Sequence, residues 1–112
     1  MPLLEITTNC SLKNADQLAS KASQATAEIL GKPESYVMVK VQPVQTLIFA
    51  GSGAPAAHLK LKSLGLPEDR TAEYSDKLCQ LISDNTGIDS SRIYIEFASP
   101  ERHMWGWDKR TF

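Results

Sequence analysis

The second residue of the chain is a proline whose chemistry depends on the residue before it. Met1 before Pro2 is a start from which the initiator Met is readily cleaved, which would leave the ring nitrogen of Pro2 as a secondary amine. An ordinary α-amine titrates near ~7.7–8.0, and burial disfavours its ammonium form. Because Pro2 leads directly into an alternating apolar segment, the terminus should be held in place. We therefore predict that Pro2 acts as a general base. The alternative is an N-terminus without a catalytic role, since many proteins begin with Met-Pro.

A second candidate is Lys32, which lies between Gly31 and Pro33. One interpretation is a solvated lysine near a helix C-terminus, where the helix dipole favours a cation. The other is a cation at the mouth of a strand that holds a substrate carboxylate.

The remaining reactive side chains form no known catalytic or metal-binding motif. His58 and His103 are too isolated for a metal site. Cys10 and Cys79 are far apart and fit neither a redox motif nor a metal-ligand cluster, so we expect free thiols. The sequence has no phosphate-binding or dinucleotide motif, and we expect neither a metal nor a cofactor.

Aromatic residues gather in the C-terminal tail at Trp105, Trp107 and Phe112. They fill a core or form the wall of a binding pocket. We expect loop from Pro100 to Phe112, with a short strand near Trp105-Gly106-Trp107.

Periodicity predicts the elements that must position these residues. Two helices are expected, one beginning at Asn14 and ending at Gly31, the other beginning near Pro67 to Thr71 and ending at Gly87. Their apolar stripes are Leu18, Ala22, Ala25 and Ile29 in the first, and Tyr74, Leu78, Leu81 and Asn85 in the second. Strands are expected from the second residue to Thr8, over 36–41, over 46–50, over 57–64 and over 92–97.

An internal repeat organises these elements. Gly31 to Val39 aligns with Gly87 to Ile95 at an offset of 56 residues, half of the 112-residue chain. The sequence therefore predicts one domain, residues 1–112, with a pseudo-repeat at about 1–56 and 57–112. The fold class is α/β (α+β), with two tandem β-α-β units forming a four-stranded mixed sheet. Right-handed crossovers place both helices on one face of that sheet.

The strands read as apolar on both faces, since Met38 opposes Val37 and Val39 and Tyr94 lies between two isoleucines. Two helices cover only one face, so we expect the other face to be covered by another subunit.

Composition limits the possible partners. The net charge is −1, with 42% hydrophobic and 22% charged residues and no run of like charges. This balance does not indicate a basic surface of the kind that binds nucleic acid or an anionic membrane. The N-terminus lacks the basic start and apolar stretch of a signal peptide, so we expect a cytoplasmic protein.

Several short motifs occur in the chain at the spacing seen in a known protein family. They are Met1-Pro2 with Thr8-Asn9, Gly31-Lys32-Pro33 with Tyr36, Gly51-Ser52 with Pro55, Ser63-Leu64-Gly65, Arg92-Ile93-Tyr94-Ile95, and Gly106-Trp107 with Thr111-Phe112. On these motifs the sequence resembles the macrophage migration inhibitory factor family over essentially its whole length.

The resemblance implies a homotrimer with three sites at subunit boundaries. It implies an isomerase that interconverts the enol and keto forms of small aromatic 2-keto acids such as phenylpyruvate, with Pro2 moving the proton. Lys32 and the backbone around Leu64 would hold the carboxylate, and Tyr94 would come from the neighbouring subunit. The apolar part of the site would be formed by Tyr36, Trp105, Trp107 and Phe112.

The chain departs from the family pattern at two places. Ala56-Ala57-His58-Leu59 replaces a Cys-x-x-Cys, so thiol–disulfide exchange is not implied. Glu96 stands where an Asn is frequent, and it should repel an anionic substrate unless it points away, is neutralised or accepts a hydrogen bond. Two other functions stay open, a cytokine-like signalling or interaction protein with a vestigial pocket and a non-catalytic ligand-binding β-α-β domain.

Overall fold

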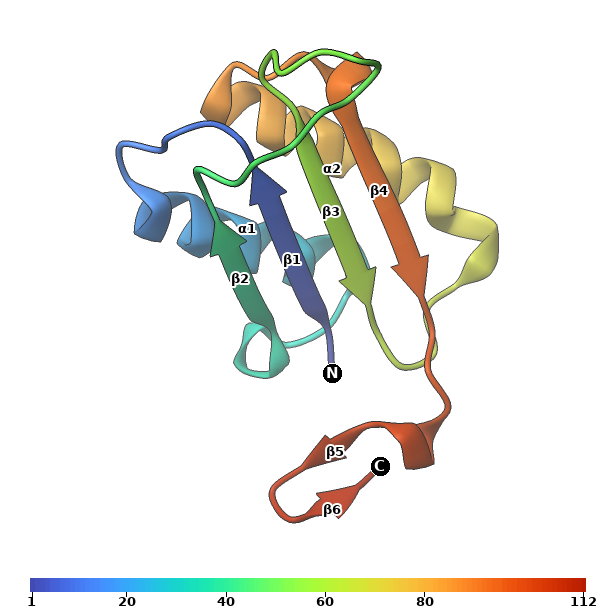
Figure 1. Cartoon of the computed structure of the whole chain (residues 1–112). Helices are drawn as coiled ribbons and strands as arrows, with labels where there is room; N and C mark the ends of the chain where they lie inside the picture. Colours follow the sequence, from blue (N-terminus) through green and yellow to red (C-terminus); the bar gives the residue numbers. More distant parts are fainter.

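The structure, a computed structural model, describes all residues from 1 to 112 and has two layers, a mixed four-stranded sheet and two helices on one of its faces (Figure 1). The strand order is β2-β1-β3-β4, in which β1 runs parallel to β2 and antiparallel to β3, and β3 runs parallel to β4. The strands are β1 (Leu3–Thr8), β2 (Met38–Gln42), β3 (Ala57–Lys62) and β4 (Ile93–Ala98), and the helices are α1 (Ala15–Leu30) and α2 (Thr71–Thr86). The predicted fold class is confirmed.

Local capping signals set the helix ends. The side chain of Asn14 accepts a hydrogen bond of 2.9 Å from the backbone N–H of Gln17, which satisfies one of the free donors at the start of α1. Gly31 and Gly87 end the two helices with φ values of 63° and 77°, a left-handed conformation that glycine adopts at little cost.

The repeat is visible in three dimensions. Helices α1 and α2 begin at Ala15 and Thr71, which are 56 residues apart, and both have 16 residues. A short 3-10 turn follows each helix at the same offset, over Glu34–Tyr36 and over Ser90–Arg92. Tyr36 therefore lies in a turn before β2 and not within that strand.

The core lies between the helices and the inner face of the sheet. Leu4, Ile6, Leu59 and Leu61 project from β1 and β3 and are at most 1% exposed. The second helix buries Tyr74, Leu78 and Ile82, which recur every four residues. This corrects the predicted stripe, because Leu81 is only partly buried and Asn85 is exposed. Side chains four residues apart form one ridge along a helix, and this ridge of α2 packs against the sheet.

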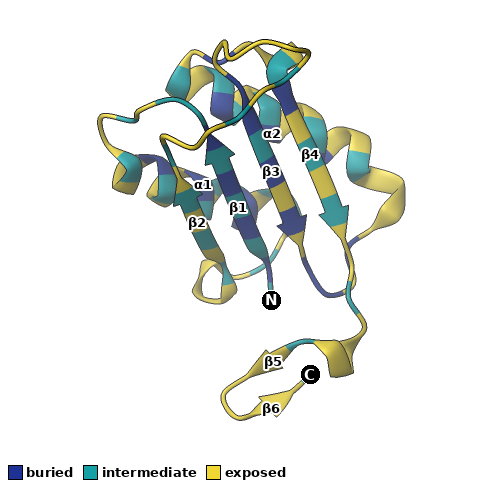
Figure 2. Ribbon diagram, viewed as in Figure 1, coloured by how far each residue is buried: buried dark blue, intermediate teal, exposed yellow.

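The outer face of the sheet is polar, which corrects the expectation that both faces are apolar. Its middle row reads Lys40, Glu5, Lys60 and Glu96 across the four strands, with alternating charge. Lys40 Nζ lies 3.2 Å from Glu5 Oε1. Apolar side chains on this face, such as Met38 and Tyr94, are each 66% exposed and lie towards its ends. The mixed exposure along β2 and β4 is visible in Figure 2.

Residues 46–50 do not form the predicted strand. The segment has one isolated bridge, between Phe49 and Ser52, and Ala50 has a φ of 54°, so the chain turns there. The segment pairs with none of the four strands of the sheet, and side chains hold it instead. Arg92 donates hydrogen bonds to the carbonyl oxygens of Phe49, Ser52, Ala54 and Pro55.

A small C-terminal hairpin projects beyond the end of the sheet near the N-terminus (Figure 1). It consists of β5 (Gly106–Trp107) and β6 (Arg110–Thr111), which confirms the predicted short strand. Asp108 and Lys109 form the two-residue turn with φ values of 51° and 67°, as expected for a tight hairpin. Most of the hairpin is exposed (Figure 2).

Candidate active site

A pocket of about 730 Å³ collects most of the predicted site residues. It lies where the start of β1, the connection from α1 to β2, the loop after β3 and the C-terminal segment come together. Its lining residues are Met1, Lys32, Pro33, Tyr36, Leu64, Gly65, Arg102, Trp107, Arg110 and Phe112.

Pro2 follows Met1 directly at the edge of this pocket and is fully buried. Its carbonyl oxygen accepts a hydrogen bond of 2.9 Å from the backbone N–H of Met38, so β2 holds the first residues of the chain in place. Burial lowers the pKa of the N-terminal amine on Met1 below its ordinary value, and the positive charges of Lys32 and Arg102 lower it further. The terminus therefore lies in surroundings that favour a neutral amine.

Lys32 is placed by the end of α1. Gly31 turns the chain out of the helix, and the Lys32 backbone N–H still donates to the Ala27 carbonyl oxygen at 3.0 Å. The Lys32 ammonium donates to the Leu64 carbonyl oxygen at 2.8 Å and to the buried Ser63 hydroxyl at 3.2 Å. It makes no ion pair with a carboxylate. An ammonium has three donors, so one remains for a ligand.

The apolar wall of the pocket comes from Tyr36, Trp107 and Phe112. The Trp107 and Phe112 rings stack with centroids 6.1 Å apart and an interplanar angle of 11°. Two hydrogen bonds from the Phe112 backbone N–H, to the carbonyl oxygens of Arg102 and Trp105, hold the end of the chain against the hairpin. Trp105 itself is not a lining residue, because its ring lies against Lys62, with Nζ 5.2 Å from the ring centroid.

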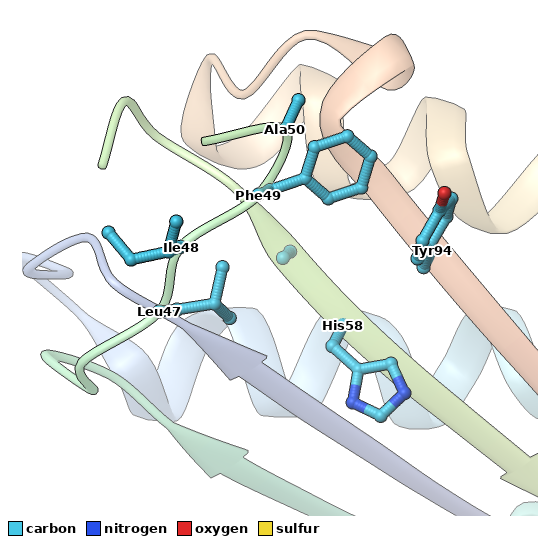
Figure 3. Close-up of a pocket in the computed structure, with 7 residues that line it drawn as sticks. Leu47, Ile48, Phe49, Ala50, His58 and Tyr94 are labelled. Carbon is cyan, nitrogen blue, oxygen red and sulfur yellow. The ribbon is translucent and has the colours of Figure 1, made fainter. Parts of the chain in front are cut away.

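Tyr94 and Glu96 lie elsewhere in the same chain. Tyr94 is on β4 and lines a second cavity of about 420 Å³, where its ring is 4.6 Å from that of Phe49 (Figure 3). Glu96 makes an ion pair with His58 on the outer face of the sheet. Neither residue reaches the pocket beside Pro2 within one chain.

Six of the seven residues that line the second cavity are hydrophobic, and Leu47, Ile48, Phe49 and Ala50 lie along one side (Figure 3). It contains neither the N-terminal amine nor Lys32. The cavity beside Pro2 is therefore the better candidate for proton-transfer chemistry, since it combines a base, a cation and an aromatic wall.

Sequence reasoning missed three residues of the site. Ser63 is buried and accepts a hydrogen bond from Lys32. Arg102 and Arg110 both line the pocket. The one sequence signal that could have found the arginines is their position beside the aromatic residues of the tail.

The chain has no group of three or more His, Cys, Asp or Glu side chains placed to hold a metal ion. None of its helices has the length and apolar character needed to cross a membrane.

The chain is similar to known proteins over its full length. It matches the sequence profile described as "Macrophage migration inhibitory factor (MIF)" over residues 1–112. It is 36% identical over 114 residues to a macrophage migration inhibitory factor homolog of Brugia malayi, covering 100% of this chain and 99% of the relative. It is 35% identical over 104 residues to the D-dopachrome decarboxylase of Xenopus tropicalis, covering 90% and 88%.

Its fold also matches a solved structure closely. The crystal structure of a macrophage migration inhibitory factor homologue from Prochlorococcus marinus superposes with a TM-score of 0.93 at 38% identity, covering 98% of each chain. A family profile that spans the chain, a relative above 30% identity over its full length and this shared fold all agree. The chain therefore belongs to the macrophage migration inhibitory factor family.

Proposed function

We propose that the protein is a keto–enol tautomerase that uses the amine of Pro2, exposed by removal of Met1, as its general acid and base. The observation that carries this proposal is the position of the chain terminus, at a pocket where burial and two cations favour a neutral amine. Membership in a family that includes a D-dopachrome decarboxylase supports isomerase-type chemistry.

The proposed reaction moves one proton. The neutral Pro2 amine removes the proton from the enol hydroxyl, and the electron pair of that O–H bond forms the carbonyl. The electrons of the carbon–carbon double bond then take a proton from the Pro2 ammonium at the neighbouring carbon. The amine returns to its neutral form and no cofactor is consumed. A base that is neutral near physiological pH can serve in both steps.

The other lining residues would orient the substrate. The free donor of Lys32 would bind the carboxylate of a 2-keto acid, and the Leu64 carbonyl and Ser63 hydroxyl would keep the ammonium in place. Tyr36, Trp107 and Phe112 would contact an aromatic ring. Phenylpyruvate has both of these groups.

We also propose that the active form is a homotrimer in which Tyr94 reaches the site of a neighbouring subunit. The support is that Tyr94 is 66% exposed, lies away from Pro2 in its own chain and sits beside an apolar segment without a strand partner.

The test is a phenylpyruvate tautomerase assay combined with mass measurement of the same N-terminus. Protein that lacks Met1 should be active, and protein that retains Met1 should be inactive because an amide nitrogen is not basic. Pro2→Ala, processed to a primary amine, should keep only a small residual activity. Full activity in a sample that retains Met1 would refute the mechanism.

A second candidate function is a cytokine-like signalling or interaction role. The observation that favours it is the apolar segment from Leu47 to Ala50, in which Ile48 is 68% exposed and which lies apart from the Pro2 pocket. Chemical capping of the N-terminal amine separates the two functions, since only catalysis depends on that amine.

A further inference from the structure

The pocket beside Pro2 contains more positive charge than a monocarboxylate needs. Lys32, Arg102 and Arg110 line it, and none of its lining residues has an acidic side chain. None of these three cations lies within 4.0 Å of a carboxylate oxygen. In the proposed function Lys32 alone binds the carboxylate of the 2-keto acid, so neither guanidinium group has an anionic partner.

Both arginines are free to bind a ligand. The side chains of Arg102 and Arg110 are exposed and make no hydrogen bond within the chain, so all their donors are available. Arg110 is held in place by Trp107, with its guanidinium carbon 5.1 Å from the ring centroid. A guanidinium that stacks on a ring keeps its edge free for two parallel hydrogen bonds to a carboxylate.

The three cations come from two different parts of the fold. Lys32 belongs to the body of the domain, at the end of α1, whereas both arginines belong to the C-terminal segment that projects beyond the sheet (Figure 1). Trp107 and Phe112 are on the same segment and supply the flat apolar surface. A ligand that satisfies all of these groups would have an anionic group at each end and an aromatic ring in the middle.

We propose that this site is selective for dianionic substrates, namely aromatic 2-keto acids that carry a second carboxylate on the ring side. Lys32 binds the carboxylate next to the reacting carbons, and Arg102 and Arg110 bind the second one. This inference rests on the proposed tautomerase function and adds its substrate class.

The test compares a matched pair of substrates, phenylpyruvate and 4-carboxyphenylpyruvate, each supplied as the enol. Turnover is measured at pH 8.5, so that the loss of a neighbouring cation does not change the fraction of neutral amine appreciably. Each exposed ion pair is expected to contribute about fivefold. The wild-type kcat/KM should therefore favour the dicarboxylate by about fivefold if one arginine binds it and by about 25-fold if both do.

Two variants and one control assign the effect to the arginines. Arg102→Gln and Arg110→Gln should each lower the ratio of the two kcat/KM values by about fivefold. Lys109→Gln removes a cation from the same hairpin that does not line the pocket, and it should leave the ratio unchanged. A wild-type ratio near one, or a high ratio that both arginine variants retain, would overturn the proposal.

Calorimetric binding of two unreactive acids separates this inference from the proposed function. The probes are phenylacetate and 4-carboxyphenylacetate, which differ by one carboxylate. Tighter binding of the dicarboxylate that is lost in the arginine variants would support the inference. If the protein turned over neither substrate, that absence of turnover would refute only the proposed tautomerase activity. Equal binding of both acids by an active tautomerase would refute only the inference.

Discussion

Substituting Lys32 by Ala tests how the site divides substrate binding from proton transfer. Lys32 Nζ already donates to the Leu64 carbonyl oxygen at 2.8 Å and to the Ser63 hydroxyl at 3.2 Å, so its position is fixed before substrate binds. A hydrogen bond to a charged partner contributes about 1.5–3 kcal/mol, and every ~1.4 kcal/mol is tenfold in affinity. Since Lys32 is only half-buried, we expect the lower part of that range, a rise in KM of about ten- to thirtyfold.

The same substitution should change kcat much less than KM. The carboxylate that Lys32 binds has the same charge in the ground and transition states, so losing the contact weakens both equally. We expect kcat to change by less than about threefold when it is measured at high pH. A KM that stays constant while kcat collapses would show that Lys32 acts on the reacting atoms.

The pH profile provides a second readout of Lys32→Ala. The pKa of the Met1 amine is lowered first by burial and then by Lys32. The Pro2 amine exposed one residue further along would feel the same two effects, and in the proposed mechanism it is active only when neutral. Activity is therefore present above this pKa and lost as the pH falls through it. Removing the cation raises the pKa, so the acidic limb of kcat/KM should move to higher pH. Lys32→Arg keeps the positive charge, so its acidic limb should lie at the wild-type pH. Lys13→Ala removes a lysine that precedes α1 and does not line the pocket, so it should leave the limb unchanged.

Two further predictions concern assembly and stability. Sedimentation should give a homotrimer, and a folded monomer at micromolar concentration would contradict the proposed sharing of Tyr94. In urea unfolding at one fixed protein concentration, Leu78→Ala should lower the free energy of unfolding by about 2–5 kcal/mol, because Leu78 is 0% exposed. Leu81→Ala should cost clearly less, since its side chain is only partly buried; equal losses would show that the stripe of α2 is assigned wrongly.

The ends of the helices could be predicted because their signals are local. Asn14, Gly31 and Gly87 act on backbone groups within a few residues, so capping and termination are readable from the sequence alone. The polar outer face could also have been read from the alternation of Lys40 with Val39 and Val41. The prediction was wrong there because Met38 and Tyr94 are apolar, although Lys40 and Glu96 follow them two residues later on the same face.

The parts that were missed depend on contacts between distant residues. An apolar run such as 46–50 becomes a strand only if another strand lies beside it, and no local pattern supplies that information. The arginines of the site were missed for the same reason. Arg102 and Arg110 are close to aromatic residues in the sequence, but only the fold of the tail brings them to the pocket of Lys32.

The distance from Pro2 to Tyr94 ties the catalytic proposal to the oligomer. Tyr94 is in register with His58, and His58 with Thr7, so two strand spacings separate Tyr94 from β1, about 10 Å. Thr7 lies five residues along β1 from Pro2, roughly 16 Å more. The two directions are perpendicular and combine to roughly 19 Å, which a tyrosine side chain cannot span.

Tyr94 and Glu96 can therefore act at a Pro2 site only from a second copy of the chain. In that copy the Glu96 carboxylate would already be in contact with the His58 ring, which engages one of its oxygens before an anionic substrate arrives. The pairing offers a reason why an acid is tolerated at that position. If the protein were monomeric, Pro2 would have to work with Lys32, the arginines and the aromatic wall alone.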